Sequence, residues 1–138
     1  MRVLLVAANP ATEAQIAFPL AGTRSEKTFL KWVQKLGVSF PYPYWTINAS
    51  CKVAKTTSSL RVKDYNLELI RKLGSSVDKV VALGKYASEG CRRAGIEHFM
   101  LPHPSGLNRK LNDPNFIEEE LNKCRMYLLK EILEDLAR

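Results

Sequence analysis

Short apolar runs alternate with segments of helical periodicity along almost the whole chain, and this alternation restricts the possible fold most. Residues Val3–Ala7, Tyr44–Asn48, Lys79–Leu83 and 98–101 form runs of strand length, and the first and third are almost entirely apolar. Strands that lack polar alternation are typical of a sheet covered on both faces, as parallel sheets are. We therefore expect four short strands in a mainly parallel sheet.

Helical spacing of apolar residues marks the segments between these strands, at 25–36, 63–73 and 85–94, and the stretch after Asp113. A glycine at or just after the end of each of the first three is expected to stop the helix, and Asp113 before Pro114 is a favourable helix start. Strands that alternate with helices predict βαβ units with right-handed crossovers. The sequence thus predicts an α/β fold, a three-layer α/β/α sandwich with a four-stranded, mainly parallel central sheet.

The last predicted helix carries a stripe of apolar residues that we expect to pack on the sheet. Its members are Leu121, Met126, Leu129, Ile132, Leu133 and Leu136.

Length and charge narrow the class of protein further. The 138 residues suit one domain, 1–138, and the net charge of +7 favours a polyanionic partner, since binding phosphates releases condensed counterions. The three cysteines have no paired spacing, so we expect free thiols in a reducing, cytoplasmic compartment, with no metal and no cofactor. No apolar stretch is long enough to cross a bilayer, and the first residues lack the pattern of a signal peptide. We expect a monomer that does not bind membranes.

Two asparagines and a histidine stand at the ends of predicted strands. Asn9 follows the first strand, Asn48 ends the second, and His103 follows the fourth. Ligands of open α/β sheets bind beyond the carboxyl ends of the strands. The sequence therefore predicts that these three residues converge on one crevice, although they come from distant segments.

The residues around Asn9 and His103 form two motifs. The first reads Ala7-Ala8-Asn9-Pro10-Ala11, and the last reads His-Pro-Ser-Gly-Leu-Asn-Arg over residues 103–109. In this pattern the chain resembles the uracil-DNA glycosylase superfamily over most of its length. The motif Pro-Ser-Gly-Leu-X-Arg most resembles that of the mismatch-specific branch. Asparagine in the first motif with histidine in the last is more similar to the single-strand-selective branch.

The resemblance implies hydrolysis of the N-glycosidic bond of a pyrimidine flipped out of DNA. His103 would stabilise negative charge on the departing base, and Asn9 would position the attacking water through its amide oxygen. An amide cannot deprotonate water as a carboxylate does, so turnover slower than in aspartate-bearing relatives is expected. Phe18 would stack on the base, and Asn48 would read its edge. The remaining base-pocket positions implied are Ala8, Pro10 and Ala11.

The same resemblance implies a DNA-binding segment after His103. Leu107 would be the wedge that fills the space left by the base, and Gly106 would let the backbone approach DNA closely. The other implied contacts to DNA are Ser105, Asn108, Arg109, Lys110 and, from the basic loop 52–63, Lys52 and Lys55.

Two residues depart from the family pattern. Ala7 replaces the usual glycine, which adds a methyl group near the base-binding backbone. Ala11 stands where uracil-restricted relatives carry a tyrosine that blocks the 5-methyl group of thymine. A small side chain there predicts tolerance for thymine, hydroxymethyluracil or another 5-substituted pyrimidine.

Other interpretations remain beside the catalytic one. Residues 103–106 and Asn9 are also typical of tight turns that carry no chemistry. A protein that keeps the fold but has lost catalysis would bind DNA only, and a basic α/β module would bind free nucleotides. Gly84-Lys85 after a strand suggests the P-loop of a phosphate-binding NTPase. In that motif, however, the leading glycine would fall at Lys79, and Tyr86 replaces the required Ser or Thr. We reject that class.

Overall fold

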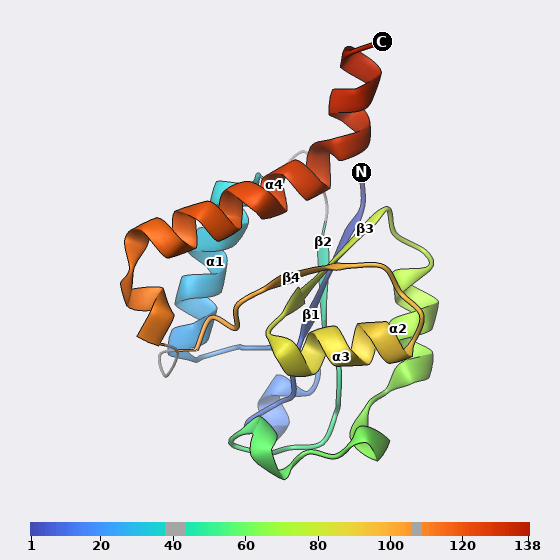
Figure 1. Cartoon of the computed structure of the whole chain (residues 1–138). Helices are drawn as coiled ribbons and strands as arrows, with labels where there is room; N and C mark the ends of the chain where they lie inside the picture. Colours follow the sequence, from blue (N-terminus) through green and yellow to red (C-terminus); the bar gives the residue numbers. More distant parts are fainter. Residues whose placement is uncertain (38–43, 106–108) are drawn as a thin grey trace.

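The computed structural model describes residues 1–37, 44–105 and 109–138 (Figure 1). Four strands, β1 (Val3–Ala7), β2 (Tyr44–Asn48), β3 (Lys79–Leu83) and β4 (Phe99–Leu101), form one parallel sheet in the order β2-β1-β3-β4. The predicted four-stranded parallel sheet is therefore confirmed. The reversal of strand order beside β1 creates the kind of crevice in which α/β proteins bind ligands.

Two layers of helices cover the sheet. Helices α1 (Arg24–Leu36) and α4 (Pro114–Leu136) lie on one face, and α2 (Leu67–Gly74) and α3 (Lys85–Arg93) lie on the other (Figure 1). Successive side chains of β1 alternate between the two layers, because the side-chain period of a strand is two residues. Leu5 belongs to the core with α1 and α4, whereas Leu4 and Val6 belong to the core with α2 and α3. The apolar first strand is thus buried on both faces, as predicted.

Most element boundaries follow from local caps. Helix α1 starts where the side chain of Thr23 accepts a hydrogen bond from the amide of Glu26, and it stops at Gly37, which has a φ of 72°. This is the left-handed conformation that favours glycine at a helix end.

The predicted helix 63–73 starts too early. Val62–Asp64 forms a separate 3-10 turn, in which the carboxylate of Asp64 accepts a hydrogen bond from the amide of Arg61. Helix α2 begins only at Leu67, where the side chain of Asn66 accepts a hydrogen bond from the amide of Leu69. The cap at Asn66 therefore sets the start of α2, although apolar residues with helical spacing precede it.

The fourth strand starts at Phe99 rather than at residue 98. The ring of His98 instead hydrogen-bonds the hydroxyl of Ser88 at 2.6 Å and the carbonyl of Ile96 at 2.9 Å. These bonds give His98 a structural role between α3 and β4, in keeping with its having no predicted function.

The expectation that the whole apolar stripe of the last helix packs on the sheet is wrong. Leu121 is buried, together with Cys124 and Leu128, but Met126, Ile132, Leu133 and Leu136 are exposed. Met126 is exposed between the buried residues Cys124 and Leu128, so it lies on the solvent face of α4. The later residues are exposed because of length: a 23-residue helix extends roughly 35 Å, whereas five-residue strands extend only about 17 Å. The last turns of α4 therefore project beyond the sheet (Figure 1). Over the described ranges, no helix has the length and apolar content needed to cross a membrane.

Candidate active site

A cavity of about 790 Å³ lies at the carboxyl ends of the strands. Loops that follow all four strands contribute to its wall. They supply Ala8, Asn9 and Ala11 after β1, Ala54 and Lys55 after β2, Gly84 and Lys85 after β3, and Pro102, His103 and Ser105 after β4. Asn9 and His103, predicted to converge from opposite ends of the chain, thus line the same cavity.

The amide of Asn9 has a fixed orientation. Its Nδ2 donates hydrogen bonds to the carbonyl of Pro10 at 3.0 Å and to the carbonyl of Ala54 at 2.8 Å. The side chain thus stabilises its own turn, as the purely structural interpretation expects, and also ties that turn to the loop after β2. Within the described ranges no group donates to its Oδ1, so an acceptor remains at the cavity wall for a ligand or a water molecule.

The imidazole of His103 is shielded from water on much of its surface. Burial lowers the pKa of His103 below its ordinary value, because the charged form loses hydration. The ring is therefore neutral at pH 7 and has one N–H to donate and one nitrogen to accept. A neutral donor in a partly dry cavity suits the stabilisation of negative charge that develops on a bound group.

Gly84 sets the position of His103. It has a φ of 90°, and a Cβ built on it would lie 3.0 Å from the Cβ of His103. The amide of Gly84 also donates to the carbonyl of Leu101 at 2.7 Å, which fastens the end of β3 to the end of β4. A side chain at position 84 would therefore make a tight contact that His103 must shift by a few tenths of an ångström to relieve.

The other residues of the first motif divide between wall and core. Ala8 and Ala11 line the cavity, whereas Pro10 is fully buried and its carbonyl accepts from the amide of Ala54 at 3.0 Å. The methyl group of Ala7 packs in the core with α1 and α4. The core therefore has room for the methyl group of Ala7 at the position where the family pattern has glycine.

Asn48 lies behind the cavity wall rather than on it. It is only 3% exposed, and its Nδ2 donates to the carbonyls of Gln15 at 2.9 Å and Ile16 at 3.4 Å. Its Oδ1 is buried and accepts no hydrogen bond from the described residues. A buried carbonyl without a donor is destabilising by about 1–3 kcal/mol, so this atom is a candidate for contact with a ligand that donates.

Phe18 and Leu20 occupy opposite environments in one loop. Phe18 is 70% exposed and is absent from the cavity wall, whereas Leu20 is buried and lines it. Leu20 also has a φ of 68°, a strained conformation for a residue with a side chain. Such strain is often retained at functional sites. The loop thus presents Leu20, rather than Phe18, to the cavity.

A sequence model of the uracil DNA glycosylase superfamily matches residues 1–129. The chain belongs to this superfamily. The predicted family is therefore confirmed, and the assignment to a branch remains a prediction. A comparison with curated proteins found no match. The matched part ends just beyond Leu128, the last buried residue of α4.

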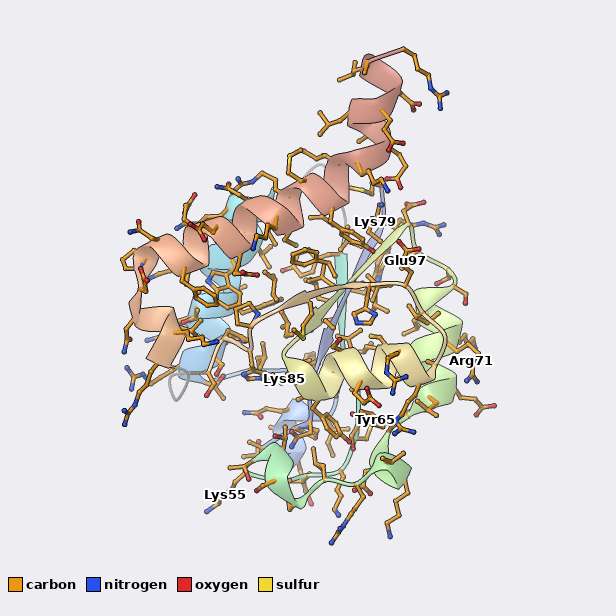
Figure 2. All side chains as sticks on the ribbon, in the orientation of Figure 1. Lys55, Tyr65, Arg71, Lys79, Lys85 and Glu97 are labelled. Carbon is orange, nitrogen blue, oxygen red and sulfur yellow. The ribbon has the colours of Figure 1, made fainter. Side chains whose placement is uncertain are left out.

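Among the described residues, three lysines and one carboxylate, Glu120, line the cavity of this superfamily member. Lys55, Lys85 and Lys110 line it, and Figure 2 shows Lys85 at the start of α3 and Lys55 beside the 3-10 turn Thr57–Ser59. Arg109 is exposed nearby in the chain. Lys52 lies outside the wall and pairs with Asp64 at 3.5 Å. The predicted DNA contacts Gly106, Leu107 and Asn108 lie outside the described residues.

Sequence reasoning missed Gln15, a buried residue that holds the superfamily's first-motif loop together. Its Oε1 accepts from the amide of Ala11 at 2.9 Å, and its Nε2 donates to the carbonyl of Ala21 at 3.0 Å. Leu20, Gly84 and Lys85 were missed as well. A glycine between a strand and a helix was the available signal for Gly84, but nothing in the sequence marks the strained backbone of Leu20.

Proposed function

We propose that this protein is a monofunctional DNA glycosylase, which hydrolyses the N-glycosidic bond of uracil or a 5-substituted pyrimidine flipped out of DNA. The observation that carries the proposal is that the unengaged acceptor of Asn9 and the neutral ring of His103 belong to one cavity. Membership of the uracil DNA glycosylase superfamily supports the same chemistry.

The reaction divides into bond cleavage and water addition. The C1′–N1 bond breaks with its electron pair passing to the base, and the N–H of His103 donates to the O2 on which negative charge develops. Asn9 Oδ1 accepts a hydrogen bond from a water molecule and so orients the water oxygen toward C1′. That oxygen bonds C1′, its surplus proton passes to solvent, and the released base takes up a proton. The products are an abasic site and the free base.

In this proposal Asn48 supplies selectivity for the base once the bound base displaces the wall residues that separate Asn48 Oδ1 from the cavity. Its Nδ2 is engaged by two backbone carbonyls, so the side chain presents only the acceptor Oδ1. An acceptor matches the N3–H of uracil and thymine and opposes the bare N3 of cytosine. Leu20 supplies the apolar wall for the ring of the base. Ala11 leaves room for a 5-substituent.

The DNA backbone would follow the cations. Lys55 comes from the loop after β2, Lys85 from the start of α3 and Lys110 from the 3-10 turn Arg109–Asn112, in which Arg109 precedes it. Ser105, at the start of the segment predicted to contact DNA, also lines the cavity. Phosphates bound at these positions would hold the flipped nucleotide over the cavity.

End-labelled oligonucleotides that contain deoxyuridine, thymine or 5-hydroxymethyluracil test the proposal. The protein is incubated with each, and alkali then cleaves the strand at abasic sites. We expect cleavage at the target position that decreases strongly in Asn9→Ala and His103→Ala. Asn122→Ala, an exposed position on α4 outside the cavity, is the matched control and should retain full activity.

An intact strand after incubation with wild-type protein would contradict the glycosylase proposal. Because Asn9 is neutral, the alternative is a member of the superfamily that binds DNA without cleaving it. Tight binding of the same oligonucleotides without any abasic product would support that alternative.

A further inference from the structure

Large apolar side chains are exposed beside the cavity but outside its wall. Phe18 is 70% exposed, and Ile16 and Val53 are each 42% exposed. Scattered exposed apolar residues are ordinary in soluble proteins. These three, however, come from two loops that also carry cavity-wall residues, so their position is informative.

Hydrogen bonds join these two loops into one unit, which we call the rim ledge, residues 9–18 and 48–55. The amide of Ala54 donates to the carbonyl of Pro10 at 3.0 Å, and Asn9 Nδ2 donates to the carbonyl of Ala54 at 2.8 Å. At the other end, Asn48 Nδ2 donates to the carbonyl of Ile16 at 3.4 Å. The exposed apolar groups therefore belong to two loops that are hydrogen-bonded to each other and that also carry Asn9.

The rim ledge is also basic. It carries Lys55, which lines the cavity, and Lys52, whose side chain is 47% exposed despite its ion pair with Asp64. Single-stranded nucleic acid is bound by aromatic side chains that stack on bases together with cations that contact phosphates, and the rim ledge carries residues of both kinds. The ledge also contributes Ala11 and Lys55 to the wall of the proposed base cavity, so a nucleotide next to the flipped one can reach the ledge.

We propose that Phe18, exposed on the rim ledge, is a stacking surface for the base that adjoins the flipped nucleotide in single-stranded DNA. The inference rests on the proposed function. Because Phe18 lies outside the cavity wall, its ring is available to a neighbouring base rather than to the flipped one. In a duplex the neighbouring bases stay paired and stacked within the helix, so the contact favours single-stranded substrates.

The test is a double-mutant cycle on binding affinity, in which the side chain of Phe18 and a base that flanks the deoxyuridine are removed separately and together. The full-length protein and its Phe18→Ala variant are titrated with single-stranded oligonucleotides that contain 2′-fluorodeoxyuridine, in which the fluorine opposes cleavage. A base-less tetrahydrofuran residue replaces the neighbour on one side or the other. Fluorescence anisotropy gives Kd for each pair. Phe18→Trp is the conservative variant, and Leu136→Ala, an exposed position at the far end of α4, is the control.

We expect Phe18→Ala to weaken binding of the intact strand by roughly 5- to 150-fold, the range for one stacked base. The loss should largely disappear when the flanking base on one side is missing, and it should be smaller on duplex DNA. Phe18→Trp should retain affinity, and Leu136→Ala should leave it unchanged.

An effect of Phe18→Ala that is absent, or that is the same with and without either flanking base, would overturn the inference. Excision of deoxyuridine by the wild-type protein is measured in parallel. It distinguishes failure of the stacking role of Phe18 from failure of the proposed glycosylase function. Retained excision without coupling to a flanking base overturns only the role of Phe18. Failure of the wild-type protein both to bind and to excise overturns the proposed function as well.

Discussion

Gly84 and His103 approach so closely that a Cβ built on Gly84 would lie 3.0 Å from the Cβ of His103. The two residues belong to the loops that follow neighbouring parallel strands, β3 and β4. The position of the imidazole therefore depends on the absence of a side chain on the adjacent loop.

The variant Gly84→Ala should displace His103 and slow excision. Relief of the contact needs a shift of a few tenths of an ångström, and a displacement of about 1 Å at a reacting centre can reduce a rate on the order of 100-fold, so we expect a decrease in kcat of about 10-fold or less with a smaller change in KM. The φ of 90° also makes this variant less stable by about 1–3 kcal/mol. Single-turnover kinetics and urea denaturation measure the two effects.

The variant Gly37→Ala distinguishes the effect of backbone strain at a positive φ from the effect of displacing His103. Gly37 has a φ of 72°, but a Cβ there meets nothing within 4 Å, and the residue lies at the end of α1 outside the cavity wall. We expect a loss of stability with normal excision by the remaining folded protein. Equal losses of kcat in both glycine variants would argue against a special role of Gly84.

Stability should depend on pH through His103. Burial lowers the pKa of His103 in the folded protein, so between this value and about 6.5 the unfolded chain binds more protons than the folded one. The stabilisation is complete above the unfolded value and is lost as the pH falls through the folded value. Unfolding free energies of wild type and His103→Gln, measured from pH 8 to pH 5, should diverge in this sense. Parallel curves would contradict the assignment of this pH dependence to His103.

Asn48→Ala should affect both stability and base selection. The change removes the donor to the carbonyls of Gln15 and Ile16, and leaving such groups unpaired is destabilising by about 1–3 kcal/mol. The proposed contact to N3–H is lost as well, so preference for uracil over cytosine should decrease. Thermal denaturation and competition between oligonucleotides check the two parts. Unchanged base preference in a destabilised variant would leave Asn48 with a structural role only.

Ala11→Tyr should narrow the range of substrates. Ala11 lines the cavity, and a tyrosine there fills space that a 5-substituent needs. We expect excision of uracil to be largely retained, and excision of 5-hydroxymethyluracil to decrease by about 10-fold or more. Relative kcat/KM values for the two bases measure this. A wild-type enzyme already confined to uracil would contradict the prediction.

The sequence was sufficient for the centre of the sheet because the two central strands, β1 and β3, are buried on both faces. Val3–Ala7 and Lys79–Leu83 are nearly continuous apolar runs, and their boundaries agree with the structure residue by residue. Helix starts were less predictable. Asn66 and Asp64 are both good capping residues, and residue type alone does not show that α2 begins after Asn66.

The candidate site was predictable where topology alone determines it. Asn9 and His103 meet because the carboxyl ends of parallel strands share one edge of the sheet. The loop 16–22 was not predictable, since its turn and the positive φ of Leu20 decide which apolar side chain enters the cavity. The choice between Phe18 and Leu20 depends on that backbone conformation and has no signal in residue type.

A double-mutant cycle on Asn9 and His103 tests the central claim most directly, namely that these two residues serve one reaction. Single-turnover rates of deoxyuridine excision are measured for wild type, Asn9→Ala, His103→Ala and the double variant. We expect each single change to reduce the rate, by roughly 10²–10³-fold for His103→Ala, and the double variant to lose much less than the product of the two. Folded single variants that excise uracil at the wild-type rate would contradict the account.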